Sequence, residues 1–239
     1  MAIRVEHVMG MPVVVELRDE AADDEALFDS VFGWLRCVDA TFSTYKADSE
    51  ISRIGRGELT MEEASDEVRY VLARCEELRA ETGGYFDARV PSGVDPSGLV
   101  KGWAVDRAAA ILDAAGRTAY AINAGGDIRF RGGSWRIGIQ HPLEPQAVAR
   151  IIEADDLAVA TSGEYERGSH VRDPHTGQPP SGILSVTITG PDLGTADAYA
   201  TAAFAMGATR ATHWTARLRG YEALTILADG RVLATPGFP

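Results

Sequence analysis

The sequence predicts an α+β fold, in which a run of helices is followed by a run of mostly antiparallel strands. Helical stripes of apolar residues occupy the first half of the chain, and strand-like segments separated by glycine and proline turns fill residues 118–190. The length of 239 residues suits one large domain, and we find no internal repeat, linker or low-complexity tract. We therefore expect a single domain over residues 1–239.

The first half is predicted to contain one strand and three helices. The β-rich run at 11–17 is the strand, and the segment 24–40 has a helical stripe made by Leu27, Val31, Trp34, Leu35 and Val38. A second helix carries Val68, Leu72, Cys75 and Leu78 and ends at Gly83 and Gly84. The third helix spans 102–116.

The second half is predicted to be rich in strands. The expected strands are 118–126, 127–133, 134–142, 149–163 and 183–190. A helix from 195 and a helical segment at 208–219 precede a closing hairpin at 221–237, where Asp229 and Gly230 are a candidate type I′ turn.

The helix at 195–207 is apolar almost everywhere except at Asp197 and Thr201. We expect Thr195 to cap it and Asp197 to lie in its first turn, where a carboxylate favours the positive end of the helix dipole. That interpretation leaves Thr201 unexplained, because alanine has the higher helix propensity. The alternative is a ligand site shared by Asp197 and Thr201.

The charge and the cysteines limit the function classes. A formal charge of −12 argues against binding to nucleic acid or to an anionic membrane, so any phosphate must be held locally. Cys37 and Cys75 lack partners at disulfide-motif or metal spacing, and we expect both to be reduced core residues. No apolar run could span a bilayer, and a strand-like segment follows Met1 closely, so we expect a cytoplasmic protein without a membrane anchor.

Two polar segments precede the strands. The loop expected at 42–54 is dense in hydroxyls and charges, and it is either a solvated connection or a functional loop. The segment 95–106 places Lys101 near the start of a helix, where a cation is unfavourable unless an anion binds there. The segment indicates a phosphate site, although it does not contain a Walker A loop.

Two more polar segments lie among the strands. The glycine pair at 125–126 is best explained by a tight hairpin turn, although Asn123 and the glycine backbone could approach a ligand. The segment 160–182 contains Thr161, Ser162, His170, Asp173 and His175, and His170 is either a general base or a structural histidine. The oxygen pair of Asp197 and Thr201 suits Mg²⁺ better than Zn²⁺.

Taken in order, these segments resemble those of the ApbE family, the FAD:protein FMN transferases. The motifs that carry the resemblance span nearly the whole chain and are individually long: MGM (9–11), FSTYKADSEISRI (42–54), GYFD (84–87), DPSGLVKGWAVD (95–106), NAGGDIR (123–129), ATSGEYER (160–167), SHVRDPHTG (169–177) and ADAYATAAFAMG (196–207).

The resemblance implies an ApbE-like, T-fold-like architecture and Mg²⁺-dependent transfer of FMN from FAD to a threonine or serine hydroxyl of a target flavoprotein, with release of AMP. By position, Asp197, Thr201 and the main-chain carbonyl of Gly98 resemble metal ligands. Contacts to FAD are implied for Met9, Tyr45, Asp95, Lys101, His170 and Val171. His170 also resembles the histidine proposed to deprotonate the acceptor, and Lys101 can neutralise charge on the phosphates.

Two departures from the family pattern are visible. Only seven residues separate GYFD from DPSG, so the segment around 88–95 is shorter than in most members, and it usually carries flavin-pocket residues. Members are often exported and lipidated, whereas we expect a cytoplasmic target here. The alternatives to a transferase are an FAD pyrophosphatase that yields FMN and AMP, and a non-catalytic FAD-binding protein.

Overall fold

The computed structural model describes residues 1–19, 23–91, 93–144, 146–163 and 171–239. Its main feature is a sheet of eight strands in the order β1-β2-β5-β6-β7-β8-β9-β10, in which every neighbouring pair is antiparallel. Its strands are β1 Ala2–Val8, β2 Met11–Leu17, β5 Tyr120–Ala124, β6 Asp127–Gln140, β7 Val148–Gly163, β8 Ile183–Gly190, β9 Glu222–Leu227 and β10 Val232–Ala234. A separate small hairpin pairs β3 Arg89–Val90 with β4 Gly93–Val94.

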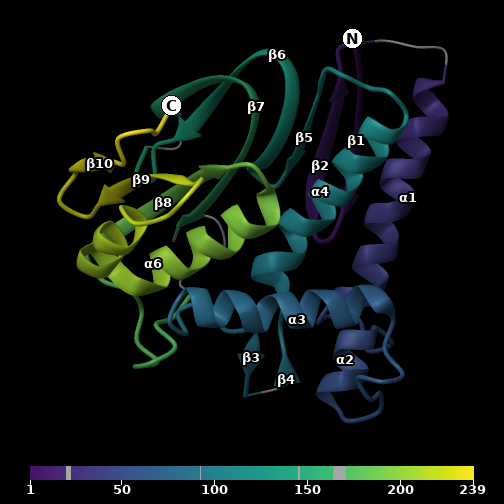
Figure 1. Ribbon diagram of the computed structural model, residues 1–239, viewed down its shortest axis with the longest axis horizontal. Helices are drawn as coiled ribbons and strands as arrows, with labels where there is room; N and C mark the ends of the chain where they lie inside the picture. Colours follow the sequence, from purple (N-terminus) through teal and green to yellow (C-terminus); the bar gives the residue numbers. More distant parts are fainter. Residues whose placement is uncertain (20–22, 92, 145, 164–170) are drawn as a thin grey trace.

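The helices gather on one side of this sheet (Figure 1). Helices α4 Ser97–Ala114 and α6 Leu193–Thr215 pack against each other, and α1 Asp24–Phe42 packs on α4 and β1. Helix α3 Asp66–Glu81 runs horizontally below α4 and α6 in Figure 1, with α2 Glu50–Gly55 and the β3-β4 hairpin lower still. This arrangement of helices on an antiparallel sheet confirms the α+β prediction.

The middle of the sheet has a core on each face, and alternation along β5 and β7 separates the two cores. On β5, Ile122 belongs to the main core beneath the helices, whereas its neighbour Ala121 belongs to a smaller core on the other face. On β7, Ala158 and Ala160 face the main core and Val159 faces the smaller one. The smaller core also contains residues of the long β6-β7 hairpin and the C-terminal segment: Phe130, Trp135, Ile139, Ile152, Leu224 and Phe238.

The two helices that carry the predicted site cross where glycine replaces a side chain. A Cβ on Gly102 of α4 would lie 2.4 Å from the carbonyl oxygen of Leu193 and 2.8 Å from Cα of Gly194. Such distances are impossible for a side chain without moving a backbone, so glycine is what permits this crossing. The contact fixes α4 against the first turn of α6.

The start of α6 differs from the prediction. Its N-cap is Asp192, whose carboxylate accepts a hydrogen bond from Thr195 N at 2.8 Å. The expected cap, Thr195, is therefore inside the helix, and Asp197 lies in the second turn rather than the first. The helix is interrupted at Gly207, which has φ +69° and ψ +173°, in agreement with the boundary expected between 207 and 208.

Several strands and short elements were predicted wrongly or missed. Strand β1, helix α2 and the β3-β4 hairpin were not predicted, and the two strands expected at 127–133 and 134–142 form one bulged strand, β6. The closing hairpin is present, but its turn is not type I′. A type I′ turn needs positive φ at both central residues. Among the described residues other than glycine, only Met9 has a positive φ, so Asp229 does not meet this condition.

The two cysteines do not share one environment. Cys75 is buried in α3 as expected, whereas Cys37 is exposed on α1. In the part of the chain that the structure describes, no helix is long and apolar enough to span a bilayer.

Candidate functional site

A cavity of about 580 Å³ opens between α4, α6, the end of β7 and the β3-β4 hairpin. Six of the nine predicted site residues line it, and they come from segments far apart in the sequence: Asp95, Gly98, Lys101, Val171, Asp197 and Thr201. Arg89 and Arg172 add positive charge to its wall. Four aspartates line the same cavity, Asp87, Asp95, Asp173 and Asp197, so groups that could hold a phosphate lie beside carboxylates that could hold a cation.

Lys101 lies between two carboxylates in this cavity. Its Nζ is 2.5 Å from Oδ2 of Asp127 and 3.8 Å from Oδ1 of Asp197. Asp127 is fully buried, and its Oδ1 accepts a hydrogen bond from Thr161 N at 3.0 Å. The ammonium is therefore fixed at the base of the cavity by partners from β6 and α6.

Asp197 and Thr201 project from one face of α6, four residues apart. Oδ2 of Asp197 accepts a hydrogen bond from Gly102 N at 3.3 Å, which ties this carboxylate to α4. The hydroxyl of Thr201 lies 3.4 Å from the hydroxyl of Ser162. A Cβ on Gly98 would sit 3.2 Å from Cε2 of Phe86 and 3.4 Å from Oγ1 of Thr201, so the start of α4 approaches Thr201 closely at this point.

The donor atoms around this space fit a hard cation. A carboxylate, hydroxyls and main-chain carbonyls are the protein ligands that Mg²⁺ takes, usually beside water and substrate phosphate. Among the described residues, no three side chains of histidine, cysteine, aspartate or glutamate come close enough to share an ion. A magnesium ion here would therefore depend on hydroxyl and main-chain oxygens in addition to one carboxylate.

A second carboxylate of α4 holds the start of α6. Asp106 accepts hydrogen bonds from Leu193 N at 2.9 Å and from Gly194 N at 2.8 Å, one on each carboxylate oxygen. Burial raises the pKa of Asp106 to about 6, although both hydrogen bonds oppose the shift. The helix start that positions Asp197 thus depends on a side chain from the helix that supplies Lys101.

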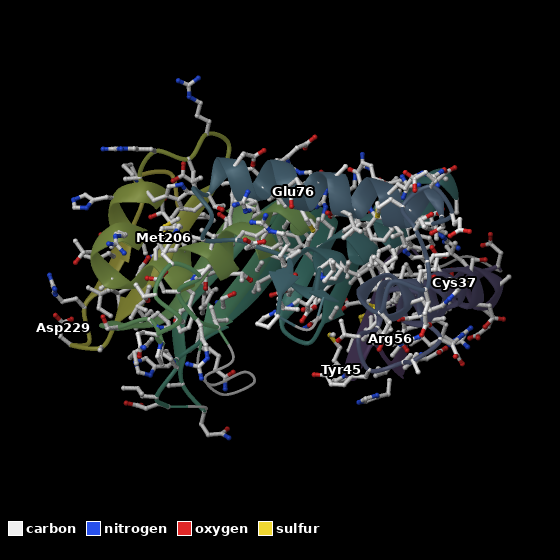
Figure 2. The ribbon with its side chains drawn as sticks, turned by 90° about the horizontal axis from the view of Figure 1, so that it is seen from below. Cys37, Tyr45, Arg56, Glu76, Met206 and Asp229 are labelled. Carbon is white, nitrogen blue, oxygen red and sulfur yellow. The ribbon has the colours of Figure 1, made fainter. Side chains whose placement is uncertain are left out.

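Two predicted site residues, Tyr45 and Met9, lie outside this cavity. Tyr45 is 98% exposed and lines a neighbouring cavity of about 360 Å³, which shares Val90 and Asp95 with the main one. Arg56 lines this second cavity too, and Figure 2 shows Tyr45 and Arg56 at the same end of the molecule. Met9 lines neither cavity, since it forms the β1-β2 turn with φ +56°. His170 lies outside the described residues.

Asp127 is the site residue that the sequence interpretation missed. The motif NAGGDIR was assigned to a turn, and the turn exists, because Gly125 and Gly126 have φ of +60° and +102° and connect β5 to β6. The alternation of side chains along the strand is the signal that could have indicated the role of Asp127. Asp127 pairs with Ala124, which faces the main core, so its carboxylate points toward the helices and Lys101.

The β3-β4 hairpin occupies the segment expected to be short. Arg89, Val90 and Pro91 line the main cavity, so the seven residues between the two motifs still contribute to its wall. Arg89 and Arg79 bind Asp87, and these interactions, led by the hydrogen bonds from Arg89, lower the pKa of that carboxyl to about 2. Asp87 therefore stays ionised beside the hairpin at neutral pH.

The chain resembles proteins of one family along nearly its whole length. The family model described as "ApbE family" matches residues 9–95 and 89–225. An FAD:protein FMN transferase of Vibrio cholerae serotype O1 is 39% identical over 132 residues, which cover 49% of this chain and 40% of that protein. One of Rhodobacter capsulatus is 29% identical over 236 residues, which cover 92% of this chain and 42% of that protein.

The fold points to the same family. A solved structure described as flavin transferase ApbE from Vibrio cholerae has a TM-score of 0.87 and 27% identity, and the match covers 99% of this chain and 97% of that one. The chain spans less than half the length of the two curated relatives above. On the extent of the family match and the shared fold, this chain belongs to the ApbE family.

Proposed function

We propose that the chain transfers FMN from FAD to a threonine or serine hydroxyl of a target flavoprotein, with release of AMP and with Mg²⁺ as cofactor. The observation that carries the proposal is the single cavity in which Lys101, Asp197, Thr201 and Gly98 converge, lined also by Asp95 and Val171. Relatives that are named FAD:protein FMN transferases support the same reaction.

In this reaction the acceptor hydroxyl attacks the phosphorus on the FMN side of the pyrophosphate. A new phosphorus–oxygen bond forms to the protein, the bridging bond to AMP breaks, and the hydroxyl proton passes to a base. We assign the base to His170, as the family resemblance implies, and Lys101 to the neutralisation of charge on the phosphate oxygens. The buried pairing with Asp127 keeps the ammonium in place as that charge develops.

The proposed magnesium site consists of Asp197, Thr201 and the carbonyl of Gly98. A bound Mg²⁺ supplies electrostatic stabilisation of the pyrophosphate oxygens. Asp197 is fixed by Gly102 N and Thr201 is adjacent to Ser162, so both oxygens are held on a rigid helix before any cation arrives. Met9 and Tyr45 remain proposed flavin contacts. The cytoplasmic location of the protein remains a prediction, which cell fractionation would test.

The test is to incubate the protein with FAD, Mg²⁺ and a candidate flavoprotein domain, and to measure the intact mass of that domain. We expect an FMN adduct on a threonine or serine, together with AMP. Asp197→Asn should abolish the adduct, because it removes the charge but keeps an acceptor for Gly102 N. Asp229→Asn is the matched control, since Asp229 is exposed and lies at the opposite end of the molecule from Tyr45 (Figure 2).

The other outcomes separate the alternatives. Release of FMN and AMP without an adduct shows a pyrophosphatase, and FAD binding without cleavage shows a storage protein. An adduct formed equally by the Asp197→Asn variant would overturn the metal assignment.

A further inference from the structure

Two cationic groups compete for Asp197 in the proposed site. One is the ammonium of Lys101, 3.8 Å from Oδ1 of Asp197. The other is the divalent cation of the proposed function, on which this inference rests. If the ammonium moved into direct contact with Asp197, it would neutralise the carboxylate that the cation needs, so some other group must hold Lys101.

Asp127 has the properties of that group. Its Oδ2 is 2.5 Å from Nζ of Lys101, whereas Oδ1 of Asp197 is 3.8 Å from the same nitrogen. Asp127 has no exposed surface, so its attraction for the ammonium is screened by solvent very little. The Lys101 side chain is itself only 15% exposed, which keeps the pair away from water.

The position of Asp127 does not depend on Lys101. Its Oδ1 accepts a hydrogen bond from Thr161 N on β7, and its backbone begins β6 directly after the Gly125-Gly126 turn. Strand pairing on both sides of β6 holds the backbone here, and the hydrogen bond from Thr161 N holds the carboxylate. Asp197 is fixed in a similar way by Gly102 N. Both carboxylates are thus held by backbone N–H groups, and the ammonium of Lys101 lies nearer to Asp127.

We propose that Asp127 is a positioning residue, which holds the ammonium of Lys101 away from Asp197 and so leaves Oδ1 of Asp197 to a divalent cation. Asp127 then separates the two positive charges of the site. The ammonium of Lys101 is assigned to the buried carboxylate of Asp127 on β6, and the divalent cation to the oxygens of α6.

The test uses Mn²⁺ in place of Mg²⁺, because free Mn²⁺ is measured directly by electron paramagnetic resonance. The full chain is titrated without nucleotide, and circular dichroism confirms that each variant is folded. Asp127→Asn keeps an acceptor for Thr161 N but loses the charge, so Lys101 should turn to Asp197. We expect Mn²⁺ binding to weaken about tenfold, as for neighbouring charged residues that are coupled.

The double variant separates positioning from simple loss of charge. Asp127→Asn with Lys101→Met removes the competing ammonium, and we expect it to bind Mn²⁺ at least as tightly as the wild type. The matched control is Asp173→Asn, which removes one buried negative charge from the same cavity, while its Oδ1 position still accepts from His175 N. We expect this control to change affinity less than about twofold.

The inference fails if Asp127→Asn binds Mn²⁺ as well as Asp173→Asn does, or if the double variant stays as weak as Asp127→Asn. Failure of the proposed metal site looks different, because there the wild type and Asp197→Asn would bind Mn²⁺ equally or not at all. That second result overturns both proposals, and the first overturns only the role of Asp127.

Discussion

At the scale of single residues, the sequence indicated Lys101 as a site residue for an electrostatic reason, and the structure shows the charged groups around it. A lysine near a helix start is electrostatically unfavourable, and an anion was expected there. The structure supplies two anionic side chains, Asp127 and Asp197, from β6 and α6. The lysine could be recognised from local sequence, but its partners could not. They are 26 and 96 residues away, and only the packing of α4 on the sheet and on α6 brings them together.

Thr201 allows a test at this scale. Its hydroxyl is 3.4 Å from that of Ser162, and Thr201→Val removes the oxygen while keeping the shape. We expect the variant to bind Mn²⁺ about tenfold more weakly, which corresponds to the loss of one polar interaction of about 1.5 kcal/mol. Thr201→Ser restores the oxygen and should recover most of the affinity. Equal affinities for the valine and serine variants would remove Thr201 from the proposed ligands.

At the scale of elements, a segment was predicted correctly where its own residues show a recognisable pattern. The glycine pair at 125–126 and the break at Gly207 were predicted because glycine marks both. Strand β1 was missed because its alternation is reversed. Ile3 and Val5 are exposed, whereas Arg4 and Glu6 face α1 and form ion pairs with Asp29 and Arg36. A pattern of polar residues toward a helix does not look like a core strand from sequence alone.

The crossing of α4 and α6 predicts a large effect of one methyl group. Gly102→Ala places a Cβ against the backbone of Leu193, and we expect it to lower the free energy of unfolding by about 3 kcal/mol. Gly33→Ala in α1 is the matched control, since its Cβ would meet nothing within 4 Å. Alanine has the higher helix propensity, so the control should be stabilised by up to about 1 kcal/mol. Urea unfolding measures both, and equal stabilities would contradict the crossing.

Asp106 makes the same crossing sensitive to pH. Burial raises its pKa from 3.8 to about 6 in the folded chain, so between these values the folded state binds more protons than the unfolded state. The contribution of Asp106 therefore lowers stability as pH rises from about 4 to about 6, by a total of about 3 kcal/mol.

Asp106→Asn cannot titrate and should lose this part of the pH dependence. Urea unfolding at pH 4.5 and pH 7 should show that the wild type loses more stability than the variant over this interval. Asp48→Asn, a change at an exposed carboxylate, is the control and should behave as the wild type does. Identical pH profiles for wild type and Asp106→Asn would show that the Asp106 carboxyl titrates alike in both states.

At the scale of the whole molecule, the fold gathers cationic side chains locally in an acidic chain. The net charge of −12 repels anions at long range, and the cavity places Lys101, Arg89 and Arg172 among four aspartates. Composition alone predicted that a phosphate must be held locally, and the family resemblance named the residues. Neither the composition nor the resemblance predicted that Tyr45 lies outside the main cavity. Its position depends on α2 and on the β3-β4 hairpin, and the sequence analysis missed both elements.

Binding of substrate should stabilise the whole chain. A ligand that binds only the folded state at 100 times its dissociation constant adds about 2.7 kcal/mol, which for a chain of this size raises Tm by roughly 5–10 °C. We expect this shift in a calorimetric scan with FAD and Mg²⁺ together, and a smaller shift with either alone. A shift from FAD that magnesium and Asp197→Asn leave unchanged would indicate a flavin site independent of the proposed metal.

The wall shared by the two cavities has a practical consequence for inhibitor chemistry. Because Val90 and Asp95 border both spaces, one small molecule seated near Lys101 and another seated near Tyr45 would lie on either side of a two-residue partition. Fragments found separately for each space are candidates for joining through a short linker, and a linker of matching length makes the second contact intramolecular. The short β3-β4 hairpin, through Val90, thereby borders the place where such a linker would pass.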